Sequence, residues 1–320
     1  MRCPYCDSKI NENDTYCPNC GNNIDGIQVK ENNESLTKQK VEEKEVRIDP
    51  IKPSKYLFTI LAYFGIMYFG VILIQFFLIS IINKENPNYE NLLSVWTQII
   101  TYAVMVIVLG FMVFKALKQD TLYFPKDIGK IMLWSLIGLV GIYTISFALS
   151  FFYQKIIGLQ GDSQNQETIV VMLKNNPLVI KIIYCVIIVV AGPLVEEIVY
   201  RKCIFGFLSK NKKLKSIWII IISGLIFGFI HVASAIIQAV ALKEWSTIRN
   251  ELLFSLDYIA MGVLFALVYE KANRNIYASY IPHLINNLIS VLIIFFWNSK
   301  LNKLKEISSM ELIFFINYIF

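Results

Sequence analysis

The sequence predicts an all-helical, multi-pass membrane protein with a small cysteine-containing domain at its N-terminus. Three observations predict this fold class: the hydropathy of the chain, the segregation of its charges and a cluster of four cysteines. The chain has 320 residues, of which 56% are hydrophobic and 17% are charged, whereas soluble domains carry about 25% charged residues. Residues 1–55 hold nine Lys or Arg and ten Asp or Glu. The rest of the chain is therefore poor in charge, which excludes a single soluble globule.

Seven apolar segments are each long enough to cross a bilayer, because about 20 apolar residues in a helix span the hydrocarbon core. An eighth, at 310–320, is too short for a full crossing, and we expect a re-entrant or interfacial end there. The sequence thus predicts seven to eight transmembrane helices. The seven full spans cover residues 56–82, 95–114, 131–153, 178–200, 216–241, 252–269 and 280–297.

Basic residues in the connecting loops predict the orientation of these helices, because cytoplasmic loops are enriched in Lys and Arg. The first set of alternate loops, at 115–130, 201–215 and 270–279, holds twelve Lys or Arg. The second set, at 83–94, 154–177 and 242–251, holds five. We expect the first set inside, and with it a cytoplasmic N-terminus in the plasma membrane. The N-terminal segment also lacks the apolar core of a signal peptide. The net charge of +6 then comes from the basic loops that orient the helices. We expect the protein to contact the lipid bilayer and not nucleic acid.

Two matched Cys-Pro-x-Cys pairs, Cys3 with Cys6 and Cys17 with Cys20, lie at the N-terminus. Four thiolates arranged as two knuckles complete a tetrahedral zinc site, and a domain of about twenty residues needs the metal to fold. The pattern resembles a short zinc ribbon with structural zinc; a rubredoxin-like iron site and a redox dithiol pair are the alternatives. We predict a zinc ribbon at 1–22, a flexible polar linker at 23–55 and a membrane domain at 56–320.

Ionisable and amide side chains inside the apolar spans are costly, so each is a candidate functional residue. Glu197 and Arg201 are spaced i, i+4 and can form an ion pair, which leaves Glu196 without a local partner. His283 and Asn287 have the same spacing, so both side chains can donate to one oxygen, while Asn286 faces elsewhere. Asp257 has no assigned role. The candidates are Glu196, Glu197, Arg201, His231, His283 and Asn287.

Each of these features alone has a plainer explanation. The glutamates lie near a helix end, where headgroup water can solvate them, and a histidine in an apolar helix is often a packing residue. His283 and Asn287 can form a polar clasp between helices. The combination of a carboxylate, two imidazoles and an amide on three helices favours a catalytic function over a packing role.

The order of these residues resembles the intramembrane CAAX-prenyl-protease and bacteriocin-processing proteins of the CPBP/Abi family. Their pattern is Glu-Glu-x-x-x-Arg, then Phe-x-x-x-His, then His-x-x-x-Asn, which matches Glu196 to Arg201, Phe227 to His231 and His283 to Asn287. The resemblance covers residues 178–297. It implies proteolysis within the membrane, with Glu196 and His231 activating water.

By the same resemblance, His283 and Asn287 would stabilise the oxyanion, and Glu197 and Arg201 would orient the site. Some family members are described as metalloproteases, so Glu196, His231 and His283 could instead hold a catalytic zinc. Either chemistry requires the fourth helix to continue through Arg201 towards Phe207, with Arg201 and Lys202 either paired or reaching to the membrane surface. The expected substrate is a membrane-associated peptide or protein.

Two other classes of protein remain open at this stage. The first is a non-catalytic membrane scaffold or bacteriocin-immunity protein whose polar residues clamp helices while the ribbon docks a cytoplasmic partner. The second is a transporter or channel subunit, which an inverted repeat of the spans would favour; the sequence shows no such repeat.

Overall fold

The structure is a computed structural model that describes residues 8–11, 15–16, 18–19, 51–159 and 161–304. It divides into two compact units, Met1–Ile48 and Asp49–Phe320. Cys3, Cys6, Cys17 and Cys20, the predicted linker and the segment at 310–320 lie wholly or largely outside the described residues. The zinc ribbon, its boundaries and the eighth apolar segment therefore stay predictions.

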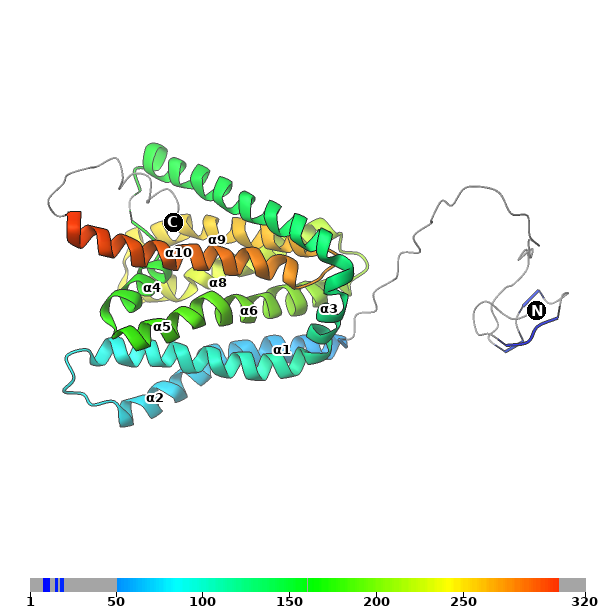
Figure 1. The fold of residues 1–320 in the computed structure, drawn as a ribbon, viewed down its shortest axis with the longest axis horizontal. Coiled ribbons are helices and arrows are strands. Elements are labelled where there is room, and N and C mark those ends of the chain that lie inside the picture. The colour runs from blue at the N-terminus through cyan, green and yellow to red at the C-terminus, as the bar shows by residue number, and fades with distance from the viewer. Residues whose placement is uncertain (1–7, 12–14, 17, 20–50, 160, 305–320) are drawn as a thin grey trace. The chain divides into compact units, whose positions relative to one another are not determined.

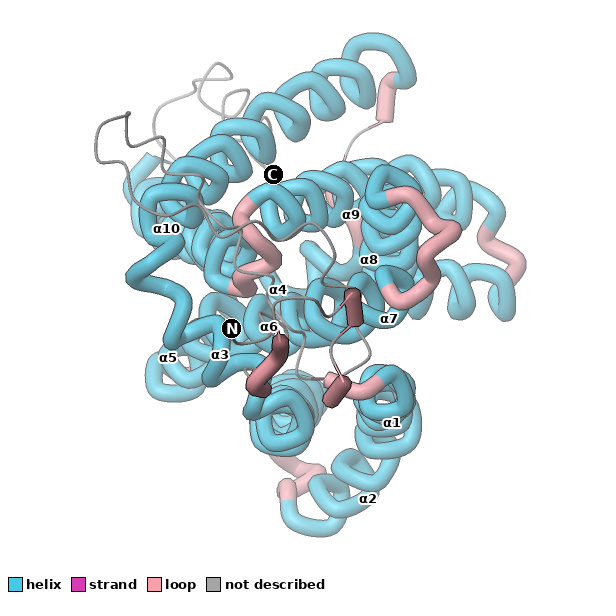
Figure 2. The backbone as a smooth tube through the Cα atoms, turned by 90° about the vertical axis from the view of Figure 1, so that its right-hand side faces the viewer, coloured by secondary structure: helices cyan, strands magenta, loops and turns pink. Residues whose placement is uncertain are grey.

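The second unit is a bundle of long helices. Among its described residues, six continuous helical stretches are long and apolar enough to cross a membrane: Pro53–Ile81, Tyr89–Ile157, Leu178–Ser209, Ser216–Leu242, Trp245–Lys271 and Tyr277–Phe295. Figure 1 shows them side by side, and Figure 2 looks along their axes. The elements are α1 (Pro53–Gly65), η1 (Ile66–Gly70), α2 (Val71–Ile81), α3 (Tyr89–Phe151), η2 (Phe152–Ile157), α4 (Gln164–Asn175), α5 (Leu178–Val186), η3 (Ile187–Ala191), α6 (Gly192–Glu197), η4 (Ile198–Phe205), α7 (Gly206–Ser209), α8 (Ser216–Leu242), α9 (Trp245–Lys271) and α10 (Tyr277–Leu304), where η denotes a π-helix.

The predicted number of seven to eight helices is wrong, because two predicted spans belong to one helix. The span at 95–114 lies in α3, and so does the span at 131–153 apart from its last two residues, which belong to η2. Helix α3 has 63 residues and would be about 95 Å long if straight. Figure 1 shows α3 running beside α1, turning at one end of the bundle and returning along its other side. The connecting residues 115–130 contain Pro125 and Gly129, yet they are helical throughout.

The fourth span continues to Ser209, as convergence of the candidate residues requires. Two π-helical segments, η3 and η4, flank the short helix α6, which carries both glutamates. Pro193 lies in the first turn of α6 and has no N–H to donate, so the preceding turn loses one hydrogen bond. A π-turn inserts one residue into a helix and is frequent at functional sites.

Helices α8 and α9 pack closely because glycines lie at their contact. A Cβ atom on Gly224 would lie 2.6 Å from the backbone N of Val263, and one on Gly228 would lie 2.6 Å from that of Ile259. Gly262 faces Gly224 from the other side, at 3.0 Å from its Cα by the same construction. The small-xxx-small spacing thus brings the two backbones together next to His231.

The basic residue after Arg201 is held by a polar clamp at the turn of α3. Lys202 forms an ion pair with Asp120, and its Nζ donates to the Arg274 carbonyl at 3.0 Å. The backbone N–H of Ile276 donates to Asp120 Oδ2 at 2.9 Å. This clamp ties α3, η4 and the loop before α10 together, and it fixes the helix that carries His283.

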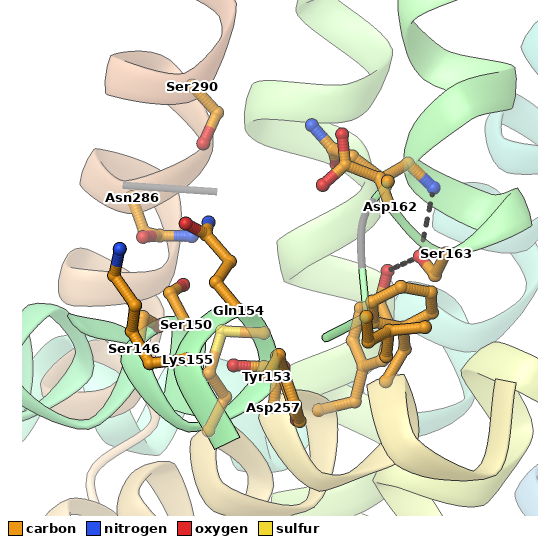
Figure 3. Close-up of a pocket in the computed structure, with 16 residues that line it drawn as sticks. Ser146, Ser150, Tyr153, Gln154, Lys155, Asp162, Ser163, Asp257, Asn286 and Ser290 are labelled. Carbon is orange, nitrogen blue, oxygen red and sulfur yellow. Dashed lines mark hydrogen bonds between the residues drawn. The ribbon is translucent and has the colours of Figure 1, made fainter. Parts of the chain in front are cut away.

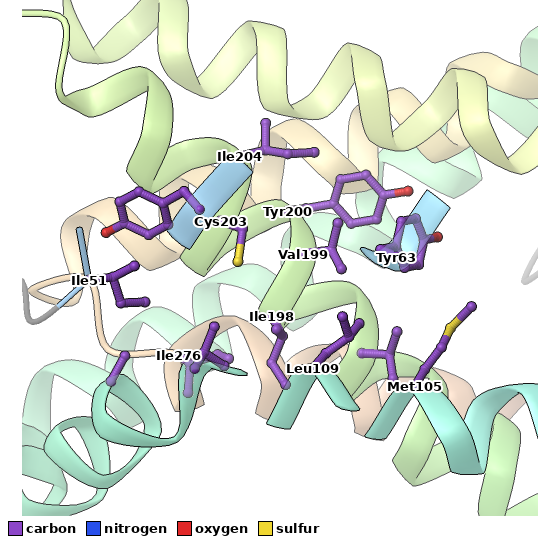
Figure 4. Close-up of a cluster of buried hydrophobic side chains, with 14 of the residues drawn as sticks. Ile51, Tyr63, Met105, Leu109, Ile198, Val199, Tyr200, Cys203, Ile204 and Ile276 are labelled. Atoms are coloured by element: carbon purple, nitrogen blue, oxygen red, sulfur yellow. The ribbon is translucent and has the colours of Figure 1, made fainter. Parts of the chain in front are cut away.

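A cluster of apolar side chains supports the same region. Figure 4 shows Tyr63 of α1, Leu109 of α3 and Tyr200 of η4 gathered around this core. Tyr200 also packs edge-on against Phe227 of α8, with ring centroids 5.0 Å apart. The core therefore joins the helix that bears the glutamates to the helix that bears His231.

Candidate active site

The carboxylate of Glu196 lies between two imidazoles that come from different helices. Its Oε2 lies 3.8 Å from Nε2 of His231 on α8 and 3.5 Å from Nε2 of His283 on α10. The three side chains are each less than one fifth exposed. His231 and His283, which follow Glu196 by 35 and 87 residues in the chain, thus contact the region of Glu196 within the helical bundle.

Glu197 points away from Glu196 and lies in a buried ion pair. Its Oε2 is 3.0 Å from Nε of Arg201, and both side chains are fully buried. Nη1 of Arg201 donates to Oγ of Ser223 at 3.2 Å. The guanidinium also lies over the rings of Phe227 and Phe265, at 5.4 and 5.8 Å from their centroids, where cation–π attraction stabilises it. Arg201 therefore neutralises Glu197 in a site without water contact.

The partners of each histidine define which ring nitrogen carries the proton. Nδ1 of His231 lies 2.7 Å from the carbonyl oxygen of Phe227, which can only accept a hydrogen bond. Nδ1 of His283 lies 3.1 Å from Oε1 of Glu197, which accepts because Glu197 is paired with Arg201. Both Nδ1 atoms are therefore donors, and both Nε2 atoms face Glu196 with a lone pair when the rings are neutral.

Asn287 lies on the wall of the same site, with its amide orientation fixed on both sides. Its Nδ2 donates to the carbonyl oxygen of Ile188 in η3 at 2.9 Å. Its Oδ1 accepts from Nδ2 of Asn286 at 3.4 Å. The carboxamide nitrogen has two hydrogens, so one remains for a ligand. Asn286, expected on another face, also lines this cavity.

A cavity of about 260 Å³ contains Glu196, His231, His283 and Asn287 in its wall. Sequence reasoning missed several tyrosines that line it, among them Tyr63, Tyr102 and Tyr258. The ring of Tyr258 stacks on His231 with centroids 4.6 Å apart, and its Oη lies 2.7 Å from Oγ of Ser163. An aromatic residue in an apolar helix gives no sequence signal that separates such a role from ordinary packing.

The short helix α4 closes one side of this cavity and was predicted as part of a loop. Its Asn165, Gln166 and Ile169 line the wall. The helix begins after Ser163, whose Oγ accepts from the backbone N–H of Gln166 at 3.3 Å. The Ser-x-x-Gln sequence at this point is the capping signal that could have found it.

The catalytic zinc considered above finds no support in these side chains. Within the described ranges, no group of three or more His, Cys, Asp or Glu side chains converges in a way that could hold a metal ion. We therefore derive no chemical step through a metal.

In the part of the chain that the structure describes, six apolar helices surround a cavity with a carboxylate, two imidazoles and an amide. This arrangement defines a multi-span membrane protein with a candidate hydrolytic site. Residues 178–289 match the family model of the type II CAAX prenyl endopeptidase Rce1-like proteins. This match includes all six candidate residues in the membrane domain. Over these residues the chain is therefore similar to the Rce1-like CAAX proteases.

Two relatives agree with this family. The chain is 28% identical over 244 residues to the Bacillus subtilis protein named "Putative membrane peptidase YdiL", covering 74% of this chain and 88% of the relative. It is 28% identical over 145 residues to the membrane-embedded CAAX protease MroQ of Staphylococcus aureus, covering 44% of this chain and 49% of the relative. No solved structure matches the chain.

Proposed function

We propose that this protein is an intramembrane endopeptidase that hydrolyses peptide bonds of membrane-associated peptides or proteins. The observation that carries the proposal is the position of Glu196 between two imidazoles whose Nε2 atoms face it. Polar side chains that only hold helices together would not need to place a carboxylate and two imidazoles around one cavity. The match to the protease family and the names of the relatives support the same activity.

Glu196 and His231 hold and activate the attacking water. The 3.8 Å between their facing atoms is too long for a direct hydrogen bond, yet one water can contact both atoms. Glu196 accepts a proton from this water as the water oxygen forms a bond to the carbonyl carbon. General-base catalysis of this kind contributes about 10²–10⁴-fold to a rate.

His283 and Asn287 stabilise the oxyanion that forms on the carbonyl oxygen. In this proposal His283 carries both ring protons: Nδ1–H donates to Oε1 of Glu197 at 3.1 Å, and Nε2–H donates to the oxyanion. Asn287 donates the second hydrogen of its Nδ2.

Collapse of the oxyanion breaks the carbon–nitrogen bond. The proton taken by Glu196 passes to the leaving amine nitrogen, either directly or by way of Nε2 of His231. The hydroxyl from water stays on the new carboxyl group. Arg201 takes no part in these transfers and holds Glu197 in place.

The remaining expectations complete this proposal. The protein lies in the plasma membrane with its N-terminus in the cytoplasm. Cys3, Cys6, Cys17 and Cys20 hold a structural zinc ion in the segment 1–22, which docks a cytoplasmic partner. These statements rest on loop charges and cysteine spacing.

The test is hydrolysis of a library of membrane-inserting peptides by purified protein in nanodiscs, read by mass spectrometry. Glu196→Gln keeps the size of the side chain and removes its basic oxygen, so turnover should fall by about 10²-fold or more. Glu244→Gln, on the exposed start of α9, removes one charge away from both the cavity and the candidate residues and serves as the matched control.

Folded yield from size-exclusion chromatography should be equal for the wild type and both variants. Equal turnover in Glu196→Gln and the wild type would refute the assignment of the base. Absence of any hydrolysis by the wild-type protein would favour the scaffold or immunity function.

A further inference from the structure

A second cavity of about 560 Å³ adjoins the candidate active site, and no step of the proposed mechanism uses it. Its wall comes from the end of α3, from η2, α9 and α10 and from the loop before α4. Figure 3 shows the labelled side chains gathered around this space. The residues that line both cavities are Gln166, Tyr258, Met261, Asn286 and Ser290.

Adjacent residues on α9 connect the two cavities. Tyr258 stacks on His231 in the first cavity, and Asp257, which is one residue earlier and about 100° around the helix, lines the second. The two cavities are therefore neighbours with a shared wall, and the inference below is that a peptide with its scissile bond beside Glu196 extends into the second cavity. This step rests on the proposed function.

The wall of the second cavity is polar although much of it comes from membrane-spanning helices. Ser146 and Ser150 of α3 and Asn286 and Ser290 of α10 line it from helices that cross the membrane. Polar side chains at this depth are costly unless they face a partner or a water-filled cavity. These side chains therefore suit a polar part of a ligand.

Asp257 is the acidic side chain that this wall presents from a membrane-spanning helix. No ion pair among the described residues includes it. Tyr153 lines the same cavity, but its hydroxyl donates to the carbonyl oxygen of Leu253 at 2.9 Å. One hydroxyl has one proton, so it cannot donate to Asp257 at the same time.

The other charged side chains of the wall are Asp162 and Lys155. Asp162 lies in the loop before α4, where desolvation, with a smaller contribution from the charge of Glu167, raises the pKa of its carboxyl group. Two carboxylates and one ammonium leave the cavity with an excess of negative charge when all three are ionised.

We propose that this second cavity binds a cationic group of the substrate near the scissile bond, with the carboxylate of Asp257 as the group that contacts the cation. The cationic group is the side chain of a Lys or Arg residue or the free N-terminal amine of the peptide. Asp257 is then a specificity-determining residue. A carboxylate inside a low-dielectric protein binds a cation far more strongly than one in water does.

The experiment measures binding, so that it does not depend on hydrolysis. The host is full-length Glu196→Gln protein in detergent micelles. The probes are dye-labelled helical peptides of Leu and Ala that carry a single Lys at successive positions, each matched with a Gln peptide. All are made with free and with acetylated N-termini, which separates a side-chain cation from a terminal amine.

The expected result is one position, or the free N-terminus, at which the cationic peptide binds at least about ten-fold more tightly than its neutral match. Asp257→Asn in the same host should reduce this preference to less than about two-fold, and Asp257→Glu should restore most of it. Glu244→Gln should retain it. Melting temperature and size-exclusion profile check the fold of each variant.

A preference that is absent in the host, or that persists unchanged in Asp257→Asn, would overturn this inference. The hydrolysis assay separates this outcome from failure of the proposed function. Hydrolysis by the wild type without a cation preference refutes the role of Asp257 alone. A preference that depends on Asp257, in a protein that hydrolyses nothing, refutes the peptidase and leaves the binding site.

Discussion

Glu196 and Glu197 are adjacent in the chain, but the structure gives them different surroundings and therefore different expected functions. Glu196 faces a cavity and two imidazoles, whereas Glu197 is fully buried against Arg201. Removing the charge of Glu196 leaves no buried cation behind. Removing the charge of Glu197 leaves Arg201 buried without a counterion.

Glu197→Gln should therefore act mainly on stability. Breaking a buried ion pair from one side costs about 3–5 kcal/mol, so folded yield and melting temperature in detergent should fall sharply. The double variant Glu197→Gln with Arg201→Gln removes both charges and should recover much of that loss. A melting temperature equal to wild type in Glu197→Gln would show that the Glu197–Arg201 pair does not hold the fold.

Asn287 and Asn286 lie next to each other but differ in what they contact. Asn287→Ala removes a proposed oxyanion donor, so kcat should fall by about 10²–10³-fold with little change in KM. Asn286→Ala removes only the group that donates to Oδ1 of Asn287, and its effect on kcat should be much smaller. Equal losses in the two variants, measured per folded molecule, would contradict the assignment of Asn287 as the donor.

At the scale of the element, the close packing of α8 on α9 places His231 against Tyr258. Gly228→Ala should destabilise the protein, because the new methyl group meets the backbone of Ile259 and the helices must separate. Overpacking of this kind costs about 1–3 kcal/mol, visible as a lower melting temperature. Gly110→Ala on α3 is the matched control, since nothing lies within 4 Å of its added Cβ.

The control should have an unchanged or slightly higher melting temperature, because alanine favours a helix more than glycine does. An unchanged melting temperature in Gly228→Ala would mean that α8 and α9 are not held at this distance. Activity per folded molecule should also fall in Gly228→Ala, since His231 lies on the displaced face three residues later.

At the scale of the whole molecule, the two units should respond independently to loss of metal. Purified protein should contain one zinc ion per chain, and Cys3→Ser with Cys6→Ser should remove it. The melting temperature and the hydrolytic activity of the membrane unit should stay unchanged. Elemental analysis that finds two zinc ions, or activity that a chelator abolishes, would contradict a metal-independent site.

The apolar spans illustrate which parts of the fold local sequence can predict. Every described predicted span lies within a helix of the structure, because a long apolar run in a bilayer must satisfy its backbone internally. The turn of α3 was not predictable, since residues 115–130 are charged enough to suggest a loop and yet helical enough to continue. The capping serine before α4 was visible in the sequence but lay in a segment interpreted as a loop.

The sequence by itself determined the chemical types of the candidate site, because imidazoles and carboxylates in apolar helices are too costly to keep without a partner. It also determined the pairing of Glu197 with Arg201, since helical spacing alone puts them on one face. Only the tertiary structure decided that Glu196 faces both histidines and that Asn286 shares their cavity. It also placed Asp257 in a second cavity, because these relations depend on helix rotation and crossing, which side chains distant in sequence set together.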